Sequence, residues 1–232
     1  MSKAILSHRY PQFVTALQKL GYETIPTERV ERFIPYEQEH ADMQCLLLDD
    51  TAFVLKCCED LVNALRSRCN VVLCADDIGH DYPRNVALNA AIAGKNIICR
   101  TDTLDSTVKA YCEAHGYWLL HVRQGYAGCS CAVVGENAII TADHGIYKAV
   151  KDRIDVLLIG QGRVRLEGAD CGFIGGASGY DPNRQTLYFC GDIQTHPDAE
   201  RIVAFCEKHQ VKVHSLTDGE LIDVGGIKFI IK

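Results

Sequence analysis

Short apolar runs separated by turn residues recur along the chain, and each pair of runs has the pattern of a β-hairpin. Three such pairs are CLLLDDTAFVL (45–55), NVALNAAIAGKNIIC (85–99) and CAVVGENAIIT (131–141). A fourth pair, CGFIGGASGYDPNRQTLYFCG (171–191), has a longer turn, and a fifth reads ELIDVGGIKFII (220–231). Glycine, asparagine and aspartate occupy the turns, as tight hairpins require. The pattern predicts five β-hairpins.

Amphipathic segments follow these hairpins and predict helices. In 101–122 the apolar residues fall at helical spacing until Gly116, after which a strand is predicted. The segment 195–216 repeats this plan, and we expect Thr195 to be the N-cap and Pro197 to lie in the first turn. The repeating unit is therefore a hairpin, a helix and a further strand.

The two ends of the chain are complementary parts of this unit. Residues 7–26 have the helix–glycine–strand form without a preceding hairpin, whereas the hairpin at 220–231 has no helix after it. We expect the ends to complete one unit between them, so that five α/β units of roughly 40–50 residues form a ring. No linker rich in proline or serine divides residues 1–232, which predicts a single domain. The alternative is an ordinary α+β domain whose strands resemble one another by chance.

Composition narrows the class of protein. The chain has 24 basic and 30 acidic residues, a net charge of −6, and no basic cluster, which disfavours nucleic acid and favours a cationic ligand. The first residues, MSKAILSHRY, lack the apolar core of a signal peptide, and no apolar run reaches membrane-spanning length. Many of the twelve cysteines lie within apolar runs, where a reduced cysteine acts as a small apolar residue. We expect a soluble, reduced, cytoplasmic protein.

Polar side chains stand where the inner strands of the units are predicted to begin. His40 and Asp42 are two residues apart, and alternation along a strand would point both to one side. The full set in chain order is His40, Asp42, Asn85, Cys129, Cys131, Glu167, Asp170, Asp218 and Glu220. Because equivalent strand ends converge on the axis of a ring, a thiol, an imidazole and several carboxylates should meet there. Such a set is more typical of a functional site than of a core, although polar strand ends facing water are the simpler alternative.

Several of these segments resemble the guanidino-group-modifying enzymes of the pentein fold, a five-bladed α/β-propeller. That family includes arginine deiminase, agmatine deiminase, dimethylarginine dimethylaminohydrolase and glycine amidinotransferase. HADMQCLLLDDTAFVL resembles the His-x-Asp blade, and RQGYAGCSC is similar to the glycine-containing approach to the nucleophilic cysteine. LEGADCGF and LTDGELIDVGG resemble the two acidic blades. The order of these residues around the ring also matches that of the family, if this chain begins at a different blade. That cyclic order is Asp170, Asp218, His40, the Asn85 blade and Cys129. The family cysteine usually lies near the C-terminus, where this chain reads DVGGIKFIIK.

The resemblance implies a role for each of these residues. Cys129 would be the nucleophile, and His40 the general acid and base. Asp218 or Glu167 would orient His40, since LEGAD resembles a Glu-Gly-Gly-Asp motif but occupies the blade of the guanidinium-binding aspartate. The implied substrate-binding residues are Asp42, Asp170, Glu167 and Asn85.

The implied activity is hydrolysis of a small cationic guanidino compound, or amidino transfer from it, through a covalent thiouronium intermediate. No cofactor or metal is implied. We also expect exposed sheet edges to pair, which favours a homodimer.

Other interpretations stay open at this point. Cys131 is an alternative nucleophile, and Asp170 and Asp218 have the residue type most common in turns. Cys129 and Cys131 with a nearby histidine and aspartate could hold zinc, but the usual two-residue spacing between paired cysteine ligands is missing. A ring of this fold can also serve as a non-catalytic binding protein, and the many thiols would suit a metal or redox protein.

Overall fold

The computed structural model describes residues 2–74 and 78–230. Within these residues, five three-stranded sheets share one topology. In each sheet the middle strand runs antiparallel to one neighbour and parallel to the other. A helix joins the middle strand to its parallel neighbour, because parallel strands need a long crossover connection.

Four of the sheets are built from strands that are consecutive in the chain. They comprise β3 (Cys45–Leu48), β4 (Thr51–Val54), α3 (Glu59–Arg66) and β5 (Asn70–Leu73); β6 (Ala91–Ala93), β7 (Asn96–Cys99), α4 (Ser106–Ala114) and β8 (Trp118–His121); β9 (Cys131–Val133), β10 (Ala138–Thr141), α6 (His144–Val150) and β11 (Asp155–Leu158); and β13 (Ser178–Asp181), β14 (Thr186–Phe189), α7 (Ala199–Lys208) and β15 (Lys212–Ser215). An antiparallel pair lies within each of the first four predicted hairpin ranges, so these hairpins are confirmed.

The remaining three-stranded sheet joins the two ends of the described chain. It comprises β1 (Lys3–Leu6), α1 (Pro11–Lys19), β2 (Glu23–Pro26) and β17 (Lys228–Ile230). The strand β1 lies in the middle, with Ala4 opposite Phe229 on one side and Thr24 on the other. The prediction that the two ends complete one unit is therefore confirmed.

The predicted fifth hairpin at 220–231, in contrast, is wrong. Its first half forms β16 (Leu221–Ile222), which pairs in parallel with β12 (Val164–Arg165) and not with β17. Gly225 and Gly226 both adopt positive φ, +79° and +74°, and turn the chain out of the strand direction between the two halves. The partner of β17 is β1, the apolar KAIL segment that the sequence analysis did not assign.

The start of α7 also differs from the prediction. Thr195 ends a short 3₁₀ helix, η1 (Ile193–Thr195), for which the Asp192 side chain accepts a hydrogen bond from the Gln194 amide. The N-cap of α7 is Asp198. The helix begins after Pro197 because proline disfavours helical geometry in the residue before it.

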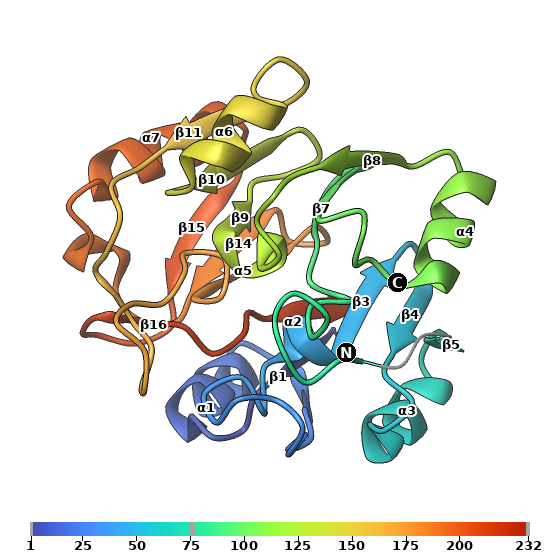
Figure 1. Cartoon of the computed structure of the whole chain (residues 1–232). Helices are drawn as coiled ribbons and strands as arrows, with labels where there is room; N and C mark the ends of the chain where they lie inside the picture. Colours follow the sequence, from blue (N-terminus) through green and yellow to red (C-terminus); the bar gives the residue numbers. More distant parts are fainter. Residues whose placement is uncertain (1, 75–77, 231–232) are drawn as a thin grey trace.

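Two single-turn helices precede the first strands of two sheets and lie near the middle of the molecule. They are α2 (Ala41–Gln44), before β3, and α5 (Ala127–Ser130), before β9. Figure 1 shows the sheets around a common centre, the crossover helices α1, α3, α4, α6 and α7 toward the outside, and α2 and α5 inside. Residues at the start of the first strands are thereby brought together.

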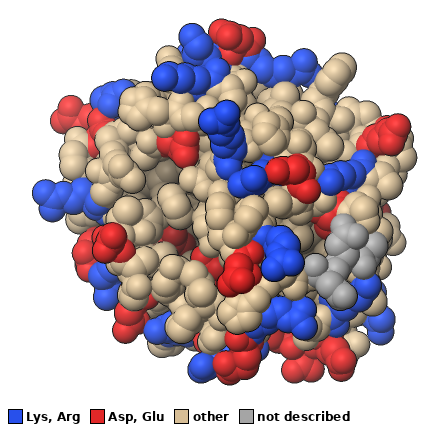
Figure 2. All heavy atoms as spheres, viewed as in Figure 1, with Lys and Arg blue, Asp and Glu red and all other residues tan. Residues whose placement is uncertain are grey.

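The surface carries both signs of charge. On the face shown in Figure 2, lysine and arginine side chains are interspersed with aspartate and glutamate side chains. Among the described residues, no helix is long and apolar enough to cross a membrane.

The sheet formed by the two chain ends depends on burial of β1. Leu6 is fully buried and packs in one apolar cluster with Phe13 and Leu17 of α1 and Phe229 of β17. We expect Leu6→Ala to lower the free energy of unfolding by about 2–5 kcal/mol, because it leaves a cavity in this cluster. Urea denaturation monitored by circular dichroism measures the change.

The matched control is the same substitution in the strand β5. Leu73 is 40% exposed, so Leu73→Ala should change the free energy of unfolding by no more than about 0.5 kcal/mol. Equal losses for the two variants would contradict a stabilising role of β1.

Candidate active site

Cys129 is held in one position by the side chain of Asn89. The Oδ1 atom of Asn89 accepts hydrogen bonds from the backbone amides of Gly128, at 2.7 Å, and Cys129, at 3.2 Å. The Nδ2 atom of the same side chain donates to Cys129 Sγ at 3.0 Å. Cys129 lies in α5 and is 3% exposed. One amide side chain thus fixes both the backbone and the thiol of this residue.

The thiol faces a buried carboxylate from α2. Cys129 Sγ donates to Asp42 Oδ2 at 2.9 Å. Asp42 is 1% exposed, and its backbone amide donates to the carbonyl oxygen of Gly225 at 3.0 Å. Residues far apart in the sequence therefore meet as a thiol–carboxylate pair.

The surroundings keep this thiol protonated. Burial raises the pKa of Cys129 well above its ordinary value, and the negative charges of Asp42 and Asp223 raise that pKa further. Burial also raises the pKa of Asp42, while the positive charges of His40 and Lys228 lower it. A ligand that brings positive charge would favour both ionised forms, because opposite charges stabilise each other in a medium of low dielectric constant.

His40 packs against a glycine turn that Asp223 holds. Gly225 has φ +79°, and a Cβ atom placed there would lie 2.3 Å from the Cβ of His40. Asp223 is 1% exposed; its Oδ1 accepts from the Gly225 amide at 3.0 Å and its Oδ2 from the Phe173 amide at 2.9 Å. His40 is thereby positioned by close packing on a turn that a buried carboxylate holds.

A third carboxylate and an amide extend the cluster. The Nδ2 atom of Asn85 donates to Glu37 Oε2 and to Tyr126 Oη, each at 3.1 Å. Burial raises the pKa of Glu37, whereas its hydrogen bond with Tyr126 and the charge of His40 lower it.

Several buried polar atoms here lack partners. Within the described residues, His40 Nδ1, Asp42 Oδ1 and Asn85 Oδ1 have no hydrogen-bond partner. Buried polar atoms are ordinarily satisfied, so these three point to a ligand that supplies hydrogen bonds, above all to the two oxygens that can only accept.

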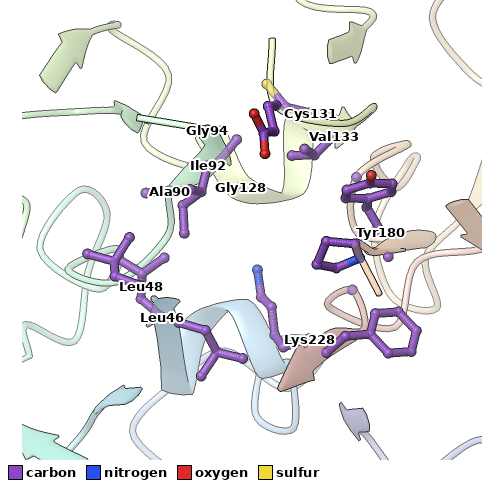
Figure 3. A pocket seen from close by; sticks show the side chains of 18 of the residues that line it. Leu46, Leu48, Ala90, Ile92, Gly94, Gly128, Cys131, Val133, Tyr180 and Lys228 are labelled. Atoms are coloured by element: carbon purple, nitrogen blue, oxygen red, sulfur yellow. The ribbon is translucent and has the colours of Figure 1, made fainter. Parts of the chain in front are cut away.

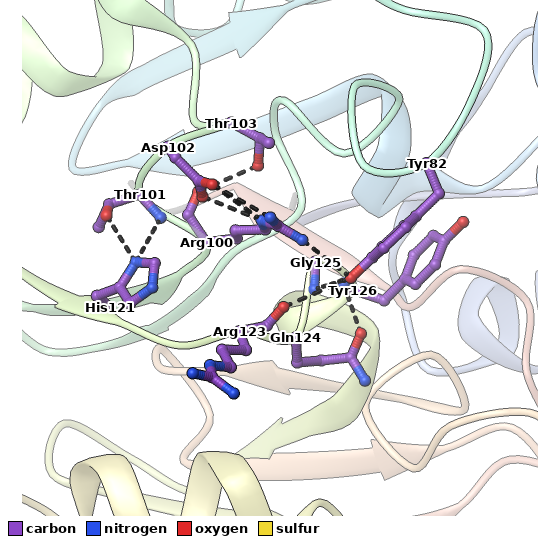
Figure 4. A network of polar contacts seen from close by, with 10 residues as sticks. All are labelled: Tyr82, Arg100, Thr101, Asp102, Thr103, His121, Arg123, Gln124, Gly125 and Tyr126. Atoms are coloured by element: carbon purple, nitrogen blue, oxygen red, sulfur yellow. Dashed lines mark hydrogen bonds and ion pairs between the residues drawn. The ribbon is translucent and has the colours of Figure 1, made fainter.

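The loop before Cys129 is anchored by the network shown in Figure 4. Tyr82 Oη accepts from the Gly125 amide at 3.1 Å, and its ring stacks on Tyr126 with centroids 5.4 Å apart. Tyr126 in turn stacks on Phe173 at 6.2 Å. These three rings lie in a row, and Tyr126 connects the row to the Cys129 cluster through Asn85.

Four of the seven predicted site residues come together in the structure. They are Cys129, His40, Asp42 and Asn85. The other three lie elsewhere: Asp170 and Asp218 are exposed, and the exposed Glu167 pairs with Arg9 at 2.9 Å. Cys131, the alternative nucleophile, packs in an apolar cluster with Ala91 and Ile139.

Asp223 is absent from the predicted site residues because the pattern of 220–231 predicts a hairpin. A hairpin there would begin near Asp218, five residues too early. Asp223 lies in the quoted motif LTDGELIDVGG, directly before the two glycines, and those glycines were the available signal. Asn89 and Glu37 carried no comparable signal, since each acts from an irregular segment.

Comparisons with known proteins place this chain in a family and a fold. A family model described as "Family of unknown function (DUF6873)" matches residues 5–228. The chain belongs to this family. No curated protein sequence matches it.

Solved structures of dimethylarginine dimethylaminohydrolase have a similar fold. A crystal structure of that enzyme as an adduct with 4-chloro-2-hydroxymethylpyridine has a TM-score of 0.58 at 9% identity, covering 91% of this chain and 90% of that chain. A cysteine-to-serine mutant from Pseudomonas aeruginosa, complexed with citrulline, has a TM-score of 0.56 at 10% identity, covering 92% and 91%. At these identities the likeness shows the fold alone: a mixed α/β fold like that of the pentein superfamily.

The raised pKa of Cys129 has a measurable consequence for its alkylation by iodoacetamide. Only the thiolate reacts, so Cys129 should react slowly at neutral pH and faster as pH rises well above 9. The exposed Cys57 is an internal reference, because its hydrogen bond with Cys58 lowers the pKa of Cys57 to about 7. Peptide mass spectrometry follows both sites in one sample.

Asp42→Asn should shift the Cys129 profile toward lower pH, because it removes the nearest negative charge. At a given pH below the pKa, each unit by which the pKa falls raises the fraction of thiolate about tenfold. The Cys57 profile should stay in place. A Cys129 profile that does not move would show that Asp42 does not control the thiol.

The close approach of Gly225 to His40 can be separated from backbone strain by a pair of variants. Gly225→Ala and Gly219→Ala both place alanine at positive φ, +79° and +92°, which costs about 1–2 kcal/mol. A Cβ at Gly219 would meet nothing within 4 Å, whereas one at Gly225 would collide with His40. We therefore expect Gly225→Ala to be the more destabilising variant in urea denaturation. Equal losses would contradict the packing of His40 on this turn.

Proposed function

We propose that this protein is a cysteine-dependent hydrolase or amidinotransferase acting on a small guanidino compound. The observation that carries the proposal is the buried thiol of Cys129 hydrogen-bonded to Asp42, whose second carboxylate oxygen has no partner among the described residues. A nucleophile and an unfilled acceptor for a cation thus share one buried position. We propose Cys129, His40 and Asp223 as the reactive centre, with Asp42, Glu37 and Asn85 binding the substrate.

A guanidinium group fits the chemistry of this cluster. It is planar, carries its charge at physiological pH and offers only donors, whereas Asp42 Oδ1 and Asn85 Oδ1 are unpartnered acceptors. Its arrival would place positive charge beside Cys129, where Asp42 and Asp223 otherwise raise the pKa of the thiol. The substrate would therefore help to ionise its own nucleophile.

The reaction follows from these positions. The Cys129 thiol passes its proton to His40, and the thiolate adds to the guanidinium carbon and forms an S–C bond. The C–N bond to the departing amine then breaks as His40 donates a proton to that nitrogen. Water, deprotonated by His40, adds to the same carbon, the S–C bond breaks, and a urea-type product leaves with the thiolate restored. In amidino transfer an amine takes the place of water.

The fold supports the proposal at a coarser level. Two structures of dimethylarginine dimethylaminohydrolase share it, one of them complexed with citrulline. We propose that the five sheets are the blades of one closed ring and one domain. In support, β6 contacts β9, β9 contacts β13, and β13 contacts β17.

A binding protein without catalysis is the second candidate. Cys129 is only 3% exposed, so a substrate could reach it only if the covering residues move. A protein that merely held a cation would need the carboxylates but not the thiol.

The test compares 2-chloroacetamidine, a cationic alkylating agent shaped like a guanidinium, with its neutral counterpart 2-chloroacetamide. We expect 2-chloroacetamidine to modify Cys129 faster, because Asp42 and Glu37 attract its charge. In Asp42→Asn this preference should fall by about tenfold to a hundredfold, the value of a charge-assisted hydrogen bond of roughly 1.5–3 kcal/mol. Intact mass and peptide mapping measure both rates.

Cys129→Ser is the control for the site of modification, and Asp218→Asn, at an exposed position, is the control for loss of charge. Asp218→Asn should keep the preference for the cationic reagent. Equal rates of the two reagents at Cys129 in the wild type would refute the guanidinium site. A preference without turnover of any guanidino compound would favour the binding protein.

A further inference from the structure

A cavity of about 430 Å³ lies between the inner strands and extends to their hairpin turns. Residues of the hairpin turns line it, among them Asp49, Gly94, Gly135 and Pro182. His40, Asp42 and Cys129, in contrast, precede the first strands of their sheets. The cavity is therefore separate from the candidate active site.

Three glycines form the thin partition between the two. Gly128, Gly175 and Gly226 line the cavity. A Cβ on Gly175 would lie 2.5 Å from the carbonyl oxygens of Gly128 and Cys129, and one on Gly226 would lie 3.9 Å from Asp42 Oδ2. The backbone of these glycines thus separates the cavity from the thiol–carboxylate pair.

One cationic side chain extends into this cavity without a partner. Figure 3 shows Lys228 in the middle of the cavity, with Leu46 and Leu48 to one side and Tyr180 to the other. Among the described residues, the side chain of Lys228 makes no ion pair or hydrogen bond. Its charge lowers the pKa of Asp42 across the partition, but no contact joins the two side chains.

The other lysine at this cavity is already paired. Lys95 Nζ lies 3.6 Å from Asp49 Oδ2 and 3.9 Å from the centre of the Tyr117 ring. The remaining wall is largely apolar and includes Ile92, Val133 and Phe229. Within the described part of the chain, the Lys228 ammonium group therefore has no counter-ion in this largely apolar cavity, whereas Lys95 has Asp49.

We propose that this cavity binds a small monocarboxylate with an apolar body. The carboxylate would accept hydrogen bonds from Lys228 Nζ, and the apolar body would pack against Leu46, Leu48 and Val133. A charge-assisted hydrogen bond in an apolar setting and the burial of apolar surface both favour such a ligand. The exposed Glu136 at the rim would repel a second negative charge, so one carboxylate fits better than two.

Isothermal titration calorimetry with octanoate tests the site, and octanamide serves as a neutral ligand of the same shape. We expect octanoate to bind to the wild-type protein, and octanamide to bind at least about tenfold more weakly because it cannot form the ion pair. Lys228→Met keeps the length of the side chain and removes its charge, and it should abolish the preference for octanoate. Lys95→Met, the matched control at the rim, should keep it.

Equal binding of octanoate and octanamide by the wild type would overturn the proposal, as would no binding of octanoate. This comparison needs no variant, so it decides the matter even if Lys228→Met does not fold. Cys129→Ser should bind octanoate like the wild type. The test of the carboxylate site is therefore independent of the proposed guanidino chemistry.

Discussion

The contact between the Cys129 thiol and the Asp42 carboxylate is the constraint on which the candidate site depends. It puts an ionisable nucleophile and a negative charge 2.9 Å apart, both shielded from water. Burying a carboxylate without a cation costs stability, so a fold built for stability alone would place an apolar side chain there. The cost is understandable if a cationic ligand completes the cluster. The raised pKa values of Cys129 and Asp42 then describe the unliganded site, and both groups ionise when the ligand binds.

The rest of the structure holds that pair in place. Asn89 fixes the thiol, while the Gly225 carbonyl fixes the α2 turn that carries Asp42. Gly225 itself is held by Asp223, which also binds the Phe173 amide. The chain between Asp223 and β17 ends in the sheet with β1, so the first strand and the last strand of the described chain help to place His40 and Asp42. A site assembled in this way needs the sheet formed by both chain ends.

The sequence predicted the parts of this arrangement that follow from local pattern. Alternating apolar runs and turn residues identified four hairpins, and the unmatched ends identified the shared unit. His40, Asp42 and Cys129 could be found because each lies a few residues before an apolar strand. The predicted strand alternation of His40 and Asp42 is wrong, however, since Asp42 lies in the helix α2 and His40 is its N-cap. Asp223 could not be found in this way, because its position depends on β17 pairing with β1. That pairing joins segments far apart in the sequence, and no local pattern predicts it. Glu37 and Asn89 act from irregular backbone, where no periodicity reports which way a side chain points.

Positive φ at Gly225 and Gly226, and the closely packed Gly175, explain how two chemically opposed environments can lie next to each other. On one side of this backbone are Asp42, Glu37 and Asp223, and on the other is Lys228. Any side chain on Gly175 would push the carbonyl of Cys129 away, so the partition can be this thin only if it is made of glycine. Lys228 is then close enough to lower the pKa of Asp42 and too far away to pair with it. Each remains available to a ligand of opposite sign, a cation on the Cys129 side and an anion on the other.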